Sequence, residues 1–258
     1  MKRMCVLLLF VLVCIGTLSL SAQQTQTNPK PTISVNAVGK ASAKADIAIV
    51  FMTVRSTSPL AVDALDQNNK KVQDIKARLT ALGYKDEQVK FSGNRFAPTG
   101  ERIYYAGGQR PTGFDAYNNV SIYLDPQLLN DVAQFNARVS SLLDELSKAG
   151  ASPTNTPISN TSMGGSSVVA FSVKEPAPYE RQALLQGLEK ARSFADEIAR
   201  RMKVQITGIE STYVSPMGRS GIQGMAGNPL AEVPYEYFSS SMDEVPIRVR
   251  VDVRYTYK

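Results

Sequence analysis

The side chains that could do chemistry here are carboxylates, amides, tyrosines and arginines, because the chain has no histidine and both of its cysteines lie within the first 22 residues. Without an imidazole there is no Ser–His–Asp triad and no histidine general base. Beyond residue 22, a cysteine nucleophile, a disulfide framework and a Cys/His zinc site are excluded as well. Two carboxylates could still hydrolyse a glycosidic bond. We expect neither a metal ion nor a cofactor.

Two asparagines interrupt faces that are otherwise apolar. The stretch GFDAYNNVSIYL, residues 113–124, alternates as a half-buried strand does, and Asn118 falls on its apolar side. Asn68 falls in the apolar stripe of a predicted helix. A buried amide without partners costs roughly 1–3 kcal/mol, and amides rarely transfer protons. We therefore predict a structural role, in which Asn68 and Asn118 approach each other or a shared backbone group.

The last predicted strand, residues 245–257, places three arginines on one face: Arg248, Arg250 and Arg254. Guanidinium groups at this spacing could bind phosphates or carboxylates of a glycan, a lipid head group or a partner protein. The alternative is a solvated sheet face whose charge is balanced by Asp252 and other acids. Both interpretations stay open at this point.

Two long loops rich in glycine, proline and tyrosine could also contact other molecules. The loop at 97–112 carries Tyr104 and Tyr105, which are candidates for a ligand or partner surface. The loop at 217–244 adds methionines and further aromatic side chains, and these suit an adaptable contact surface.

The N-terminus predicts export. Residues 1–22 combine Lys2 and Arg3 with an apolar run and small residues near Ala22, the layout of a cleaved signal peptide. A permanent anchor helix is the alternative, because the run approaches the length that spans a bilayer. Residues 23–31 are polar and contain two prolines, so they form a tether to a domain over 32–258. We expect a periplasmic or envelope-associated protein with no transmembrane helix after cleavage.

The formal net charge is +6, and it falls by two when the signal peptide is removed. This charge is mild and is largely paired along predicted helices. A nucleic-acid-binding protein would carry a stronger basic patch with interleaved aromatic residues, so no nucleic-acid partner is expected.

Hydrophobic periodicity predicts three helices, at 59–82, 127–149 and 177–202. Strands are predicted at 32–39, 45–56, 87–96, 113–124, 157–174, 204–214 and 245–257. The third helix carries an apolar stripe formed by Leu184, Leu188, Ala191, Ala195, Ile198 and Met202. These elements predict an α+β fold: a largely antiparallel β-sheet with about three amphipathic helices packed on one side. The first and third helices each precede two strands, which favours an internal duplication.

The strand at 45–56 is apolar on both faces, which is typical of a strand covered on both sides. Its second cover could be another layer of the same chain or a neighbouring subunit.

Four stretches resemble the SIMPL family, also called DUF541: residues 33–54, 113–124, 183–211 and 246–257. Their order and spacing extend the resemblance over about 32–258. It implies an exported, periplasmic or envelope-associated α+β protein. Some bacterial relatives are linked to oxidative-stress defence, and some assemble into large ring-like oligomers. The family supplies no established catalytic residues, so none is assigned here.

Three functions follow from these observations. The first is a non-enzymatic envelope protein that acts as a homo-oligomer or by binding an envelope partner, with a role in stress defence implied by the resemblance. The second is a glycan or small-molecule binding module that uses the tyrosine loop or the arginine face. The third is a hydrolase with two carboxylates in a cleft.

Overall fold

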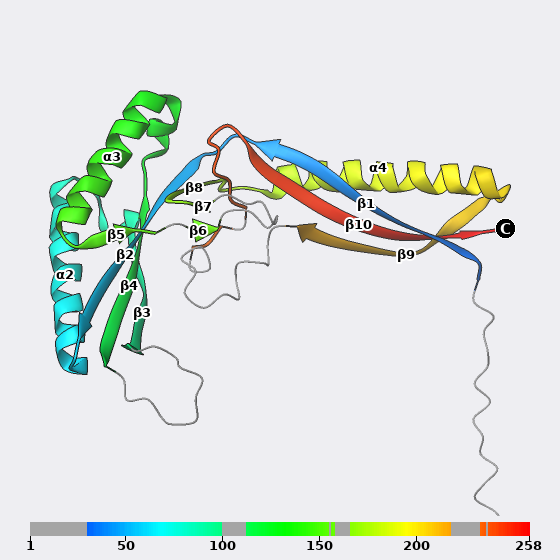
Figure 1. Ribbon diagram of the computed structural model, residues 1–258. Coiled ribbons are helices and arrows are strands. Elements are labelled where there is room, and N and C mark those ends of the chain that lie inside the picture. The colour runs from blue at the N-terminus through cyan, green and yellow to red at the C-terminus, as the bar shows by residue number, and fades with distance from the viewer. Residues whose placement is uncertain (1–29, 100–111, 155, 158–165, 218–232, 236) are drawn as a thin grey trace, which may run out of the picture.

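The computed structural model describes residues 30–99, 112–154, 156–157, 166–217, 233–235 and 237–258, and its elements form two bodies set at an angle (Figure 1). One body, the arm, consists of β1 (Thr32–Ala43), β9 (Ile206–Met217), β10 (Val245–Tyr257) and α4 (Ala177–Met202). The other, the head, contains α2 (Ala61–Ala81), α3 (Val132–Lys148), β2 (Ile47–Ser58), β3 (Val89–Thr99), β4 (Gly113–Tyr123), β5 (Ala151–Pro153) and β8 (Val169–Ser172). The predicted α+β class is confirmed.

The strands divide between two main antiparallel sheets, a division that the sequence pattern does not predict. The sheet of the arm has the order β1-β10-β9. The sheet of the head has the order β3-β4-β2-β5, with β8 also paired to β2. β6 (Thr156–Pro157) and β7 (Ser166–Ser167) form a separate two-stranded ribbon.

The head buries the strand that is apolar on both faces. Val50, Met52 and Val54 of β2 pack in one cluster with residues of α2 and α3. Ile49 and Phe51 pack on the other face in a cluster that includes side chains of the segment near residue 238. This chain therefore covers both faces itself, and no neighbouring subunit is needed to explain the pattern.

The helices of the head begin later than the sequence predicts. The helix predicted from residue 59 begins at Ala61, because Leu60 still has extended backbone angles. The helix predicted over 127–149 is divided into a short 3₁₀ helix, η2 (Pro126–Asn130), and α3. Asp131 lies between them with extended backbone and accepts hydrogen bonds from the N–H groups of Ala133 and Gln134, so it acts as the N-cap of α3. A similar 3₁₀ turn, η1 (Asp86–Gln88), precedes β3.

In the arm, α4 lies along one face of the sheet, over β1 and β10 (Figure 1). The side chains that it buries are small ones spaced by four residues: Ala183, Gly187, Ala191, Ala195 and Ala199. The stripe predicted for this helix is therefore wrong in part, because Ile198 and Met202 are exposed. The cause is the close approach of helix to sheet, which leaves no room for larger side chains on the contact face.

The two sheets are joined directly, since only residues 44–46 separate β1 from β2. In each sheet, two strands follow a helix, and the second of them lies beside a strand that precedes that helix. In the head, β4 lies beside β2, and in the arm, β10 lies beside β1. This likeness of order does not show an internal duplication, which stays a prediction.

None of the helices in the described part of the chain has the length and apolar character needed to cross a lipid bilayer. The predicted signal peptide, residues 1–22, lies outside the described residues.

Candidate functional site

The two asparagines singled out in the sequence are in direct contact inside the head. Asn118 Nδ2 donates a hydrogen bond of 2.6 Å to Asn68 Oδ1. Asn68 Nδ2 in turn donates to two backbone carbonyls, Val54 O at 3.1 Å and Ala116 O at 3.0 Å. The predicted approach is confirmed. The pair joins α2 to neighbouring strands β2 and β4, and the amide of Asn68 is fully buried among them.

The opposite face of the same strands carries a charged network that the sequence does not reveal. Asp115 is buried, and its carboxylate accepts hydrogen bonds from Arg55 Nη2 at 2.7 Å, from Tyr117 Oη at 2.9 Å and from Thr57 Oγ1. The hydrogen bonds from Arg55 lower the pKa of Asp115 below its ordinary value, against the opposing effect of burial. This carboxylate is therefore ionised and fully bonded at neutral pH, which makes it a poor general base.

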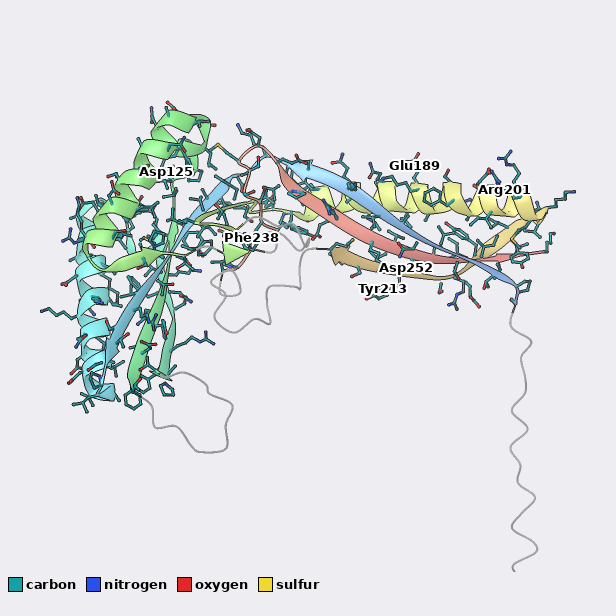
Figure 2. All side chains as sticks on the ribbon, in the orientation of Figure 1. Asp125, Glu189, Arg201, Tyr213, Phe238 and Asp252 are labelled. Carbon is teal, nitrogen blue, oxygen red and sulfur yellow. The ribbon has the colours of Figure 1, made fainter. Side chains whose placement is uncertain are left out.

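A shallow trough of about 360 Å³ lies on the open face of the arm, the face of its sheet away from α4. It is lined by residues of all three strands: Ser34, Val35, Asn36, Ser211, Tyr213, Asp252, Val253 and Arg254. Strand register places Asn36, Asp252 and Tyr213 in one row across the sheet. Figure 2 shows Tyr213 and Asp252 on the side opposite to Glu189 and Arg201 of α4.

The row of the trough combines an aromatic ring with polar groups. Tyr213 is 65% exposed, so its ring is available to a ligand. Beside it, Asn36 Nδ2 donates a hydrogen bond to Asp252 Oδ1. An exposed ring next to a carboxylate, an amide and a guanidinium can stack on a sugar ring and bond its hydroxyl groups.

The three arginines predicted to share a face do so, and all are exposed on the open face. Arg250 Nε lies 3.2 Å from Asp252 Oδ2, and Arg254 Nη1 lies 3.6 Å from Glu210 Oε2. Acids thus balance part of the charge, as the solvated alternative predicts, while Arg254 also lines the trough.

A second hollow, of about 250 Å³, lies in the head beside Tyr123 and Tyr235. The ring centroids of these two tyrosines are 6.2 Å apart. Burial raises the pKa of Tyr123 to about 12, and its hydroxyl finds no hydrogen-bond partner among the described residues. Two carboxylates, those of Asp46 and Glu87, also line the hollow.

Compared with the residues predicted from the sequence, the structure adds two residues to the candidate site and does not describe two others. Tyr104 and Tyr105 lie outside the described residues. The sequence pattern does not single out Tyr213 and Asn36, because they reach one site only through the order β1-β10-β9, in which strands far apart in the chain are neighbours. The described residues contain no cluster of three or more side chains suited to hold a metal ion.

Two comparisons bear on identity. A family model described as "SIMPL: Protein of unknown function (DUF541)" matches residues 33–257. The search among curated proteins gives no match.

Proposed function

The chain belongs to the SIMPL family, and from that premise we propose that it is an exported, non-enzymatic protein of the cell envelope that works by self-association or partner binding. A contribution to oxidative-stress defence is part of the proposal only through the resemblance to family members. The network around Asp115 supports the non-enzymatic part, because its charged groups bond one another and leave little proton-transfer capacity.

The observation that carries the proposal is the exposure of the arm. Its sheet has a helix on one face only, and the described residues leave the other face and most of the length of both edge strands uncovered. Exposed apolar side chains of the arm include Phe194 and Met202 of α4 and Ile209 and Val214 of β9. Uncovered strand edges with apolar neighbours are surfaces that natural proteins use for pairing with another chain.

Light scattering on the purified protein at tens of micromolar tests the proposal. We expect a mass of two or more chains, or association with an envelope protein recovered by cross-linking in cells and identified by mass spectrometry. A strict monomer with no cross-linked partner would contradict it.

The trough on the open face favours a second function, binding of a glycan. Tyr213 offers a stacking surface, while Asp252, Asn36 and Arg254 offer hydrogen-bonding groups for hydroxyl or carboxylate substituents. Retention on immobilised neutral and acidic polysaccharides tests this alternative. Tyr213→Ala should abolish retention and leave the unfolding temperature unchanged, whereas Tyr257→Ala on β10, outside the trough, should retain binding. Equal retention by wild type and Tyr213→Ala rules out this site.

Replacing Arg248, Arg250 and Arg254 together extends the test to the whole face. If the arginines bind an acidic glycan, the triple variant loses retention on acidic polysaccharides only. If retention on neutral and acidic polysaccharides is unchanged, the ring of Tyr213 and not the charge of the arginines determines binding.

A further inference from the structure

Side chains of α4 cover the outer edge of β1 at Val38 and Lys40 and leave the first half of this edge open. Gln186 Oε1 of α4 accepts a hydrogen bond of 2.8 Å from Lys40 N, and Lys190 Nζ lies 3.4 Å from Val38 O. Two long polar side chains of α4 thus cover the backbone groups of β1 at its outer edge. Backbone groups two residues apart in a strand point the same way, so those of Ser34 and Asn36 also face this edge.

Gln186 and Lys190 are four residues apart and belong to one column of side chains along α4. This column continues with apolar residues. Four residues of helix and two of strand advance by similar lengths, about 6.0 and 6.6 Å. Because Gln186 and Lys190 are level with Lys40 and Val38, this spacing places the next residues of the column level with Asn36, Ser34 and Thr32. Those residues are Phe194, Ile198 and Met202. Their exposed fractions are 54%, 37% and 49%.

The edge of β1 at Ser34 and Asn36 therefore has unpaired backbone groups and exposed apolar side chains beside it. Its backbone groups receive no hydrogen bond from any other described element, because β1 pairs with β10 alone. Beside it stands a row of three exposed apolar side chains, which we call the α4 row: Phe194, Ile198 and Met202. An unpaired strand and an apolar helix flank together form a surface that another strand and helix could cover.

The other edge of the same sheet is less suited to pairing. Lys40 directs its backbone away from β10, so its neighbour Gly39 and the residue opposite, Val249, direct theirs toward each other. Pro216 lies opposite Val249 on the other side of β10, so its backbone faces the free edge of β9, where it has no N–H to donate. The register of β9 also shifts near Ile209 and again near Ile206. Proline and irregular register are features that protect an edge strand from pairing.

We propose that the open half of β1 pairs antiparallel with the same strand of a second copy, about a two-fold axis at Ser34. The inference rests on the proposed self-association and identifies its surface. The two arm sheets then form one continuous six-stranded sheet, with both α4 helices on the same face. The α4 row is centred on Ile198, level with Ser34, so Ile198 meets its own counterpart and Phe194 meets Met202 of the second copy.

Charge complementarity supports a second copy as the occupant. Glu197 and Arg201 lie on the outward side of α4 beside the α4 row, and they form an ion pair at 2.7 Å within one chain. A two-fold axis level with Ile198 brings Glu197 of each copy close to Arg201 of the other. The symmetric contact thus pairs opposite charges around an apolar centre, as e and g positions do in paired helices.

Cysteine cross-linking tests the pairing and its register. Ser34 of each copy lies on the axis, where paired strands bring α-carbons to about 5.5 Å, within disulfide range. In the full chain, Ser34→Cys should give a disulfide-linked dimer on a non-reducing gel after mild oxidation. Ser42→Cys, exposed on the same strand but beyond the open half, should not, and it also reports any background from Cys5 and Cys14. Absence of a Ser34→Cys dimer overturns the pairing.

Charge insertion separates this inference from the proposed function. The double variant Phe194→Glu/Ile198→Glu should reduce the mass found by light scattering at least twofold, while Leu185→Glu, equally exposed on the outward side of α4, should not. If the double variant keeps the wild-type mass, self-association stands and this surface is wrong. If wild type is itself a monomer, both the surface and the proposed self-association fall.

Discussion

Gly39 of β1 and Gly187 of α4 face each other with no side chain between them: a Cβ atom on Gly187 would lie 3.2 Å from Gly39 N. A Cβ on Gly39 would lie only 1.7 Å from Ala183 O, inside the backbone of the helix. Helix and strand therefore touch through their main chains at this point, and the small residues of α4 extend that close contact along the arm.

Gly39→Ala should push α4 away from the sheet. We expect a loss of at least about 1–3 kcal/mol in the free energy of unfolding, because overpacked contacts against backbone relax poorly. Urea unfolding measures the loss. Gly208→Ala is the matched control, since a Cβ there meets its nearest atom, Thr256 Oγ1, at 3.4 Å. Equal stabilities of the two variants would show that the close contact does not limit packing.

Asn118→Leu should destabilise the head although it places an apolar residue on an apolar face. The change removes the donor to Asn68 Oδ1 and leaves that buried acceptor unpaired, at a cost of about 1–3 kcal/mol. Asn68→Leu should cost at least as much, since Asn68 also bonds two carbonyls. Asn69→Leu, on the exposed side of the same helix, provides the control. Unchanged or greater stability of Asn118→Leu would refute the structural role assigned to the pair.

Asp115→Asn should change how stability depends on pH. The pKa of Asp115 is lowered in the folded protein, so its stabilisation is present above the ordinary carboxyl pKa of about 3.9 and is lost as pH falls through the lower, folded value. Wild type should therefore exceed Asp115→Asn in stability at neutral pH, by about 1.5–3 kcal/mol for a charged hydrogen-bonded group, and the difference should shrink in acid. Urea unfolding from pH 7 to 3 measures this, with the exposed Asp66→Asn as control. A difference that is constant with pH would contradict the assignment.

Removing the hydroxyl of either of two tyrosines of β4 should affect stability differently. Tyr123→Phe deletes a buried hydroxyl that has no hydrogen-bond partner among the described residues, so stability should stay the same or rise. Tyr117→Phe deletes the donor to Asp115 at 2.9 Å, so stability should fall by about 1 kcal/mol. Thermal unfolding compares the two. A fall for Tyr123→Phe as large as that for Tyr117→Phe would indicate an unrecognised partner of the Tyr123 hydroxyl.

Much of the fold could be predicted because local patterns determine the elements. The alternation around Asn118 and the stripe around Asn68 located a strand and a helix, and the cost of burying an amide then indicated that the two side chains meet. The doubly apolar character of β2 was also evident, but the sequence could not tell that Val233 and Phe238, from a distant segment, cover the second face.

What the sequence could not supply was the pairing of distant strands. The row of Asn36, Asp252 and Tyr213 draws on three strands, and the contacts of β1 with β10 span almost the whole described chain. The prediction that Ile198 and Met202 lie on the buried side of α4 is wrong for a related reason. Large residues ordinarily mark the buried side of a helix, but the glycine at position 39 in a distant strand makes alanine the side chain that fits.

The pairing of β1 with β10 has a consequence for the order of folding. Among the described residues, β1 (residues 32–43) pairs only with β10 (residues 245–257), so the head can acquire its sheet before the sheet of the arm is complete. Closing that long loop gives the arm a high contact order, which slows its formation. Until residues 245–257 are in place, β1 is therefore an unpaired strand.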